Sequence, residues 1–272
     1  MEGLGVRKLN NGFTVTTLHY TADPTKRTEI WRKEAKYGLP EDLFDREYEI
    51  NYSSSAGKPY YPSFKQSIHC RDLQYIKGKE VLRGWDFGYH HPAVSFSQID
   101  NKDRWIILFE IMGKDITIDN FASRIVTESN TRFPNVIFKD YCDPAGSQKS
   151  DKGERSSIEI INRLGIYPKY RARPIMDGVT IIRKKLQIRD DGSPEILIDK
   201  NKCPIIVEAF SGGLRYPEND PEDELPEKDG YFEHLMDTLR YVATNVFSIS
   251  GNYYNFYNLQ PARYPYSWET SL

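Results

Sequence analysis

The chain has 272 residues, of which 39% are hydrophobic and 28% charged, and its formal net charge is −2. This balance fits one large or two modest globular domains and excludes a fibrous or mainly disordered protein. The three cysteines form no CxxC pair, and their odd number argues against a disulfide framework and for a reducing cytoplasm. The apolar runs are strand-sized, so we expect neither a signal peptide nor a membrane span.

The first 75 residues predict a small separate unit. Residues 13–19 have the pattern of a strand, and the charged run 28–37 that of a helix. Residues 53–59 are rich in Ser, Gly and Pro, which is typical of a linker. We therefore expect a domain boundary near residue 75.

Three strand-like runs follow, at 80–86, 92–99 and 104–111, and the short turns between them predict antiparallel neighbours. After them, residues 116–131 predict a helix and residues 135–140 a strand.

The next helix, 156–164, has clear start and stop signals. Ser156 and Glu159 have the spacing of a capping box, and Gly165 follows the last turn. A short strand at 166–170 comes next, and Asp177 is placed to cap a helix that ends at Leu186.

The last third of the chain predicts a hairpin, a long helix and a tail. Residues 187–198 predict the hairpin, with its turn at 190–192. Residues 230–247 predict a helix with one apolar side. The Asn, Tyr and Pro-rich residues 250–272 predict a tail that is disordered until it docks on a partner such as the portal. The order β-β-β-α-β-α-β-α predicts an RNase H-like α/β domain over 76–249, with a mixed five-stranded sheet of three antiparallel and two parallel strands flanked by helices.

Three acidic residues fall where this fold would bring them together. Asp86 ends the first of the three strands among apolar neighbours, and Asp143 follows the fourth strand, which we expect beside the first. Asp237 lies in the last helix, three residues after His234, so both side chains share nearly one face. Carboxylates gathered from separate elements are typical ligands of divalent cations, and two such ions about 3.5 to 4 Å apart can promote phosphodiester hydrolysis.

Each acidic residue also has a simpler interpretation. Asp86 could cap the turn at the end of its strand, and Asp143 could start an Asp-Pro turn. Asp237 could form an ion pair with Arg240. His234 could be an auxiliary ligand, a proton carrier for the leaving oxygen, or a helix histidine with a structural partner. Asp140 is a weaker alternative ligand, because strand alternation sends it to the face opposite its neighbour Tyr141.

Basic residues gather between 149 and 189, where 11 Lys and Arg stand against four Asp and Glu. Such a stretch can be a solvated surface or a surface that follows a phosphate backbone. The candidate DNA-binding residues are Lys149, Lys152, Arg155, Arg183, Lys184, Lys185 and Arg189.

Three segments resemble the nuclease domain of tailed-phage large terminase subunits. They are 84–93, with its Asp-Phe-Gly turn, 143–146, with its Asp-Pro-Ala-Gly, and 234–241, a His/Asp helix that ends in Leu-Arg-Tyr. The resemblance covers about residues 76–248. It implies that Asp86, Asp143 and Asp237 hold two Mg²⁺ or Mn²⁺ ions and, with His234, cut double-stranded DNA with little sequence preference during genome packaging in the host cytoplasm.

The leader is similar to the junction between the ATPase and nuclease domains of that family, so residues 1–75 are interpreted as the end of an ATPase domain and a linker. By resemblance, the partners are the terminase ATPase domain, the small terminase subunit and the portal. The chain contains no Gly-x-x-x-x-Gly-Lys-Ser/Thr phosphate loop, and we do not expect it to hydrolyse ATP by itself.

Two other interpretations stay open. Another RNase H-like enzyme, such as a junction resolvase or a transposase, would share the carboxylates without the ATPase-like leader. A non-catalytic DNA-binding or motor module could keep the fold. The Asp-Phe-Gly turn does not make this a protein kinase, because no glycine-rich loop or Val-Ala-Ile-Lys strand precedes it and no Ala-Pro-Glu follows.

Overall fold

The computed structural model describes residues 3–8, 12–37, 44–45, 48–50, 57–147, 155–189, 191–218 and 225–247. In the N-terminal part, β1 (Leu4–Lys8) pairs antiparallel with β2 (Thr14–Leu18). Two short turns, η1 (Tyr20–Ala22) and η2 (Pro24–Lys26), lead to α1 (Glu29–Lys36). The Thr28 hydroxyl caps α1 by accepting a hydrogen bond from the backbone N–H of Trp31, at 3.1 Å. The strand and helix predicted here are confirmed.

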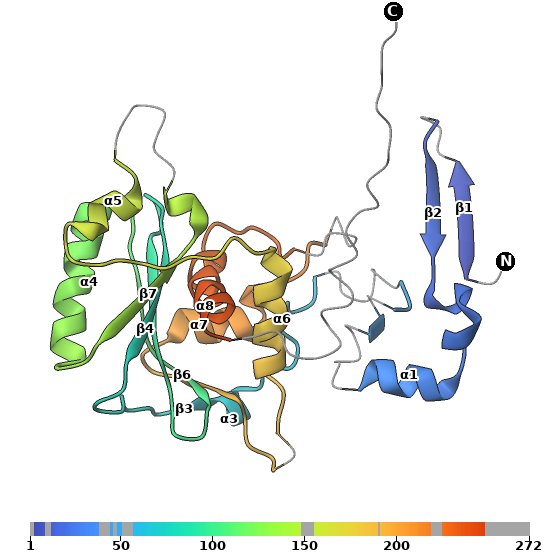
Figure 1. Cartoon of the computed structure of the whole chain (residues 1–272), viewed down its shortest axis with the longest axis horizontal. Helices are drawn as coiled ribbons and strands as arrows, with labels where there is room; N and C mark the ends of the chain where they lie inside the picture. Colours follow the sequence, from blue (N-terminus) through green and yellow to red (C-terminus); the bar gives the residue numbers. More distant parts are fainter. Residues whose placement is uncertain are drawn as a thin grey trace, which may run out of the picture.

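The larger part of the chain is built on one mixed sheet with the strand order β3-β8-β6-β5-β4-β7 (Figure 1). Its strands are β3 (Cys70–Arg71), β4 (Val81–Asp86), β5 (Ala93–Ile99), β6 (Trp105–Met112), β7 (Phe138–Cys142) and β8 (Ile196–Asp199). Strands β4, β5 and β6 are antiparallel, while β7 runs parallel to β4 and β8 parallel to β6. The predicted RNase H-like α/β class is confirmed, with β3 as a sixth strand.

Helices cover both faces of this sheet, as Figure 1 shows. On one face, α4 (Ile118–Arg132) packs through Phe121 and Ile125 against the rings of Trp85 and Phe96, and α5 (Ser157–Asn162) lies beside α4. On the other face, α6 (Ile175–Lys185) and α8 (Phe232–Val246) pack against each other and close a second core. The short segments α3 (Gln66–His69), η4 (Pro144–Ser147), α7 (Pro204–Glu208) and η5 (Ala209–Gly213) complete the domain.

The hairpin predicted at residues 187–198 does not form. Ile188 and Pro194 form only an antiparallel bridge, and the second arm becomes β8, which lies parallel to β6 inside the sheet. Its residues are buried on both sides, and an interior parallel strand needs such a continuous apolar run. The strand expected at 166–170 is reduced to one bridge between Lys169 and Tyr141.

Several predicted boundaries move by a few residues. Strand β7 begins at Phe138, because Asn135 has a positive φ of 59° that interrupts an extended strand. Helix α6 begins at Ile175 with Pro174 at its N-cap, so Asp177 lies in the first turn instead of capping it. The capping box of Ser156 and Glu159 is present as predicted.

The N-terminal boundary of the large domain lies before residue 75. Tyr60, Phe64 and Cys70 are buried in the core beneath α6 and α8, and β3 pairs with β8. Burial of these side chains ties residues 57–75 to the sheet, so they cannot form a linker. Residues 53–56 of the expected linker and the expected tail at 250–272 lie outside the described residues.

All three cysteines are free and buried, in line with the expected lack of a disulfide framework. No helix in the described ranges has the length and apolarity needed to span a membrane.

Candidate functional site

Helix α8 approaches β4 closely because β4 has a glycine at the crossing point. A Cβ atom at Gly84 would collide with the main-chain carbonyl of Thr238, and it would also lie 3.1 Å from the Ser95 hydroxyl. With no side chain at Gly84, the helix packs directly on the strand. This contact brings the helix residues His234 and Asp237 towards the end of β4.

The first two predicted acidic residues lie side by side. Trp85 of β4 and Cys142 of β7 are partners in the parallel ladder. Asp86, the last residue of β4, and Asp143, the residue after β7, therefore lie at the same edge of the sheet. The negative charge of Asp143 contributes to raising the pKa of Asp86, which agrees with this proximity.

Asp86 lies beneath α8 and is partly buried, with 13% of its side chain exposed. Its carboxylate accepts a hydrogen bond from Nδ1 of His234 at 2.8 Å. Burial, helped by the negative charges of Asp237 and Asp143, raises the pKa of Asp86 to about 6 against the opposing effect of His234. The hydrogen bond to Asp86 raises the pKa of His234. The pair thus holds a proton between the sheet and the helix.

The other two carboxylates also have partners on α8. Nε of Arg240 lies 3.0 Å from Asp237, so the ion pair considered as the simpler interpretation of this residue is present. The Tyr241 hydroxyl donates a hydrogen bond to Asp143 at 3.2 Å. The structure therefore gathers all four predicted catalytic residues on neighbouring elements, each with a partner from α8 or from the cluster itself.

The acidic cluster has the donor atoms of a divalent metal site. Three carboxylates supply the hard oxygen ligands that Mg²⁺ and Mn²⁺ prefer. Within the described part of the chain, no three His, Cys, Asp or Glu side chains are arranged to hold a metal ion. The ligand chemistry fits a divalent metal ion, but Asp86 is hydrogen-bonded to His234 and Asp237 to Arg240.

Asp140, the weaker alternative ligand, has a structural role. Its carboxylate accepts two hydrogen bonds from the Arg83 guanidinium, at 2.7 and 2.9 Å, and one from Nε1 of Trp85, at 2.7 Å. Both side chains of the ion pair are less than 10% exposed. Asp140 therefore anchors β7 to β4 on the face covered by α4.

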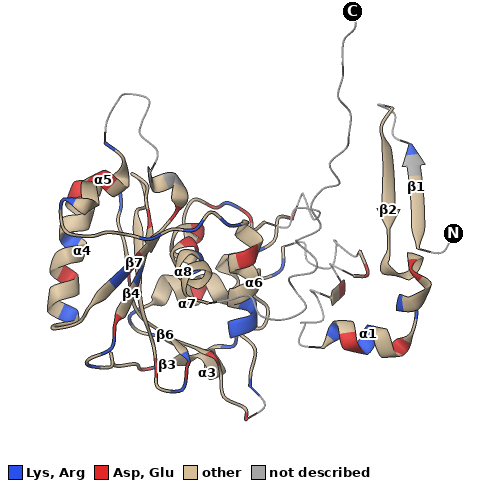
Figure 2. Ribbon diagram, viewed as in Figure 1, with Lys and Arg blue, Asp and Glu red and all other residues tan. Residues whose placement is uncertain are grey.

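The predicted DNA-binding residues are dispersed, and the prediction is wrong for Arg183. Figure 2 shows the basic residues in the last turn of α6. Arg183 is only 8% exposed, and its guanidinium donates hydrogen bonds to the Tyr60 carbonyl and the Tyr216 hydroxyl. It faces the core because it lies among the buried positions of an amphipathic helix, so it cannot grip a phosphate.

Of the other candidates, Arg155 and Lys184 are exposed. Lys185 forms an ion pair with Glu195, at 2.9 Å, and Arg189 bonds to the main-chain carbonyl of Lys102. Lys149 and Lys152 lie outside the described residues.

Sequence reasoning missed two aromatic groups at the site. Tyr241 lies one helical turn after Asp237, so the i, i+4 spacing could have identified it. The ring of His91 lies 5.8 Å from that of His234 and 5.8 Å from that of Tyr231, between centroids. No local pattern indicates this cluster, because it joins the turn after β4 to the start of α8.

The mixed sheet, the helices on both faces and the acidic residues at the ends of β4 and β7 define an RNase H-like α/β domain. No protein-family model and no curated protein matches the sequence.

Solved structures of large terminases do match. The large terminase of a thermophilic bacteriophage is 16% identical, with a TM-score of 0.58, and the match covers 83% of this chain and 54% of that one. The P22 large terminase nuclease domain is 15% identical, with a TM-score of 0.52, over 69% of this chain and 92% of that one. The chain spans about half the length of the thermophilic phage protein, and it has the fold of a large terminase nuclease domain.

Proposed function

We propose that this chain is a divalent-metal-dependent endonuclease that cuts double-stranded DNA with little sequence preference, as the nuclease part of a phage terminase large subunit. The observation that carries the proposal is the meeting of Asp86 and Asp143, at the ends of two paired strands, with Asp237 on the helix packed against them. Carboxylates that converge from separate elements are the ligand set of metal-assisted phosphodiester hydrolysis. The fold shared with the P22 nuclease domain supports this assignment.

In this proposal, Asp86, Asp143 and Asp237 would hold two Mg²⁺ or Mn²⁺ ions. When bound, such ions activate water and offset the charge on the leaving oxygen. His234 positions the Asp86 carboxylate through its 2.8 Å hydrogen bond and can carry a proton at Nδ1. The Tyr241 hydroxyl orients the Asp143 carboxylate through its hydrogen bond.

The DNA would be held by its phosphates, because Lys and Arg side chains contact a phosphate backbone without regard to base sequence. The exposed residues Arg155 and Lys184 are the described candidates for this grip, and Lys149 and Lys152 remain proposed with them.

The partners are proposed from the same likeness. The match to the thermophilic phage terminase covers more of this chain than the match to the P22 nuclease domain, which supports assigning the N-terminal residues to the ATPase side of a terminase. An ATPase domain, a small terminase subunit and a portal would then act with this chain in the host cytoplasm.

Plasmid cleavage tests the proposal. The native chain is incubated with supercoiled DNA and Mg²⁺, Mn²⁺ or EDTA, beside Asp86→Asn and Asp237→Asn. Cleavage should require a metal and fall by about 100-fold or more in both variants, because each loses a carboxylate ligand of the ions that offset the charge on the reacting phosphate. Asp119→Asn, which alters an exposed carboxylate in the first turn of α4, is the matched control and should cut like the native chain.

Two results would contradict the proposal. If the native chain fails to cut with either metal while it still binds the plasmid, the chain is a non-catalytic DNA-binding module. If both site variants still cut, the chemistry lies at other residues. Circular dichroism of each variant shows whether its fold is intact.

A further inference from the structure

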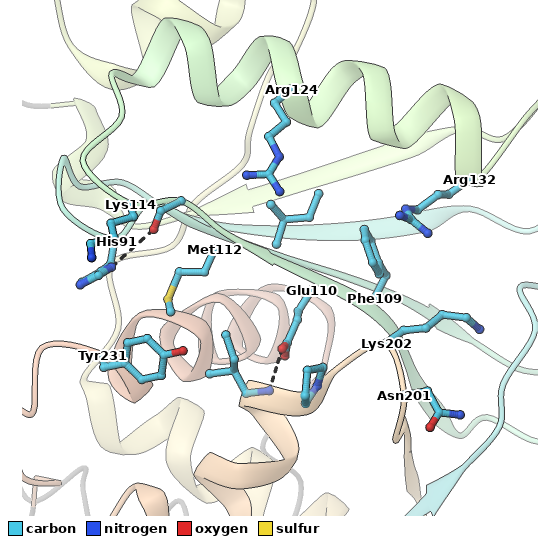
Figure 3. Close-up of a pocket in the computed structure, with 14 residues that line it drawn as sticks. His91, Phe109, Glu110, Met112, Lys114, Arg124, Arg132, Asn201, Lys202 and Tyr231 are labelled. Atoms are coloured by element: carbon cyan, nitrogen blue, oxygen red, sulfur yellow. Dashed lines mark hydrogen bonds between the residues drawn. The ribbon is translucent and has the colours of Figure 1, made fainter.

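A cleft opens at the edge of the sheet where β6 continues beyond its neighbour. Strand β6 pairs with β8 only from Trp105 to Ile107, although it extends to Met112. The cleft beside its second half has a volume of about 630 Å³. Helix α4 borders it on one face of the sheet, and the loop before α7 borders it on the other (Figure 3).

Four cationic side chains line this cleft: Lys114, Arg124, Arg132 and Lys202. Figure 3 shows Arg124 extending from α4 towards the cleft. Arg124 makes no hydrogen bond or ion pair with any described residue, and it is exposed. Arg132 and Lys202 are already paired, with Glu128 at 2.7 Å and Asp199 at 2.8 Å. Arg124 thus presents a cationic group that the described fold does not use.

The acidic side chain among the described lining residues is turned away from the opening of the cleft. The Glu110 carboxylate accepts hydrogen bonds from the backbone N–H groups of Ile205 and Ile206, at 2.7 and 2.9 Å. These bonds cap the start of α7 and tie the acidic group to the wall of the cleft. The charge offered to a ligand is therefore positive.

Aromatic rings lie among these cations. The guanidinium of Arg132 lies 3.9 Å from the ring centroid of Phe109 on β6. At the other end of the cleft, the Tyr231 ring packs on His91, which in turn packs on His234 beside Asp86. In the sheet, Met112 pairs with Ala93 and Ala93 with Asp86, so two strand spacings, about 10 Å, separate the cleft floor from the carboxylate site.

We propose that this cleft binds a single strand of DNA next to the cutting site, a surface that rests on the proposed nuclease function. Basic side chains interleaved with aromatic rings are the chemistry with which proteins follow a single nucleic-acid strand, through phosphate contacts and base stacking. The volume is that of a small-ligand pocket, which accommodates a few nucleotides of one strand but not a double helix. Arg124 and Lys114 contact phosphates, and Tyr231 offers a face to a base. The strand freed by a cut is thereby held away from its complement.

Fluorescence anisotropy with labelled oligothymidylate tests the cleft in EDTA, so that the readout does not depend on cutting. The variants are Arg124→Ala, Lys114→Ala and their combination. Lys77→Ala is the matched control, because it removes one exposed cation outside the cleft. Each lost phosphate contact should lower the slope of log affinity against log salt by about 0.7, so the double variant should lose about 1.4.

The result that overturns the proposal is a double variant with the same affinity and salt slope as Lys77→Ala. Displacement of the oligothymidylate from the native chain by polyglutamate at equal charge concentration would also overturn it, because the cleft would then favour an acidic peptide. Failure of the nuclease proposal is distinguishable, since in that case the native chain binds the strand through these residues and yet cuts no plasmid.

Discussion

Gly84→Ala would separate the helix that carries Asp237 and His234 from the strand that carries Asp86. The added methyl group would overlap the Thr238 carbonyl, which is main chain inside α8 and cannot rotate away. The helix or the strand must therefore shift. Overpacking of this kind costs about 1–3 kcal/mol, and in a domain of this size each kcal/mol lowers the melting temperature by roughly 2–4 °C. Because the shift separates the carboxylates, cleavage should fall by more than the loss of folded protein explains.

Gly88→Ala is the matched control, since nothing lies within 4 Å of a Cβ atom placed there and its φ is not positive. Thermal unfolding of both variants and of the native chain gives the stability difference, and plasmid cleavage well below the melting temperature gives the functional one. If Gly84→Ala melts and cuts like Gly88→Ala, then close packing of α8 on β4 does not set the geometry of the site, and the reasoning fails.

Two further substitutions test the interior. Asp140→Asn leaves the Arg83 guanidinium without a countercharge and should lower the free energy of unfolding by about 3–5 kcal/mol in urea, while the exposed Asp119→Asn should change it by less than about 0.5 kcal/mol; equal effects would contradict a structural role for the pair. Burial raises the pKa of Glu110 to about 7 in the folded chain, whereas the unfolded chain releases this proton near pH 4.5. The free energy of unfolding should therefore fall by up to about 3 kcal/mol as the pH rises from about 4.5 to about 7. Glu110→Gln removes this loss, so the stability advantage of the native chain over the variant should shrink between about pH 4.5 and about pH 7, and a constant difference would refute the shift.

Local signals predicted most of the elements, and long-range pairing explains where they failed. The capping box at Ser156 and the apolar side of α8 depend on residues a few positions apart, and both are present as expected. The second arm of the expected hairpin left its local partner for β6, some 90 residues earlier, because burial on both sides favours Ile196–Asp199 inside the sheet. The same holds for β3, whose two residues have no strand pattern of their own and pair only with β8.

The positions of the acidic residues followed from topology, but their partners did not. Adjacent parallel strands put Asp86 beside Asp143 once the order of the strands was given. The contact of His234 with Asp86 depends on how closely α8 packs, which is set by the bare backbone of one glycine. The prediction for Arg183 failed because a count of basic residues does not distinguish an exposed cation from one buried among tyrosines.

Helix α8 supplies a partner to every carboxylate of the proposed site, namely His234 to Asp86, Tyr241 to Asp143 and Arg240 to Asp237. Two of these partners carry or can carry positive charge, so they offset the repulsion among the acidic groups without a metal ion. In the proposed function, a divalent cation bound by the same oxygens would compete with the His234 and Arg240 side chains. These partners all come from α8, so the close approach of this helix to β4 at Gly84 sets how near they lie to the carboxylates at the strand ends.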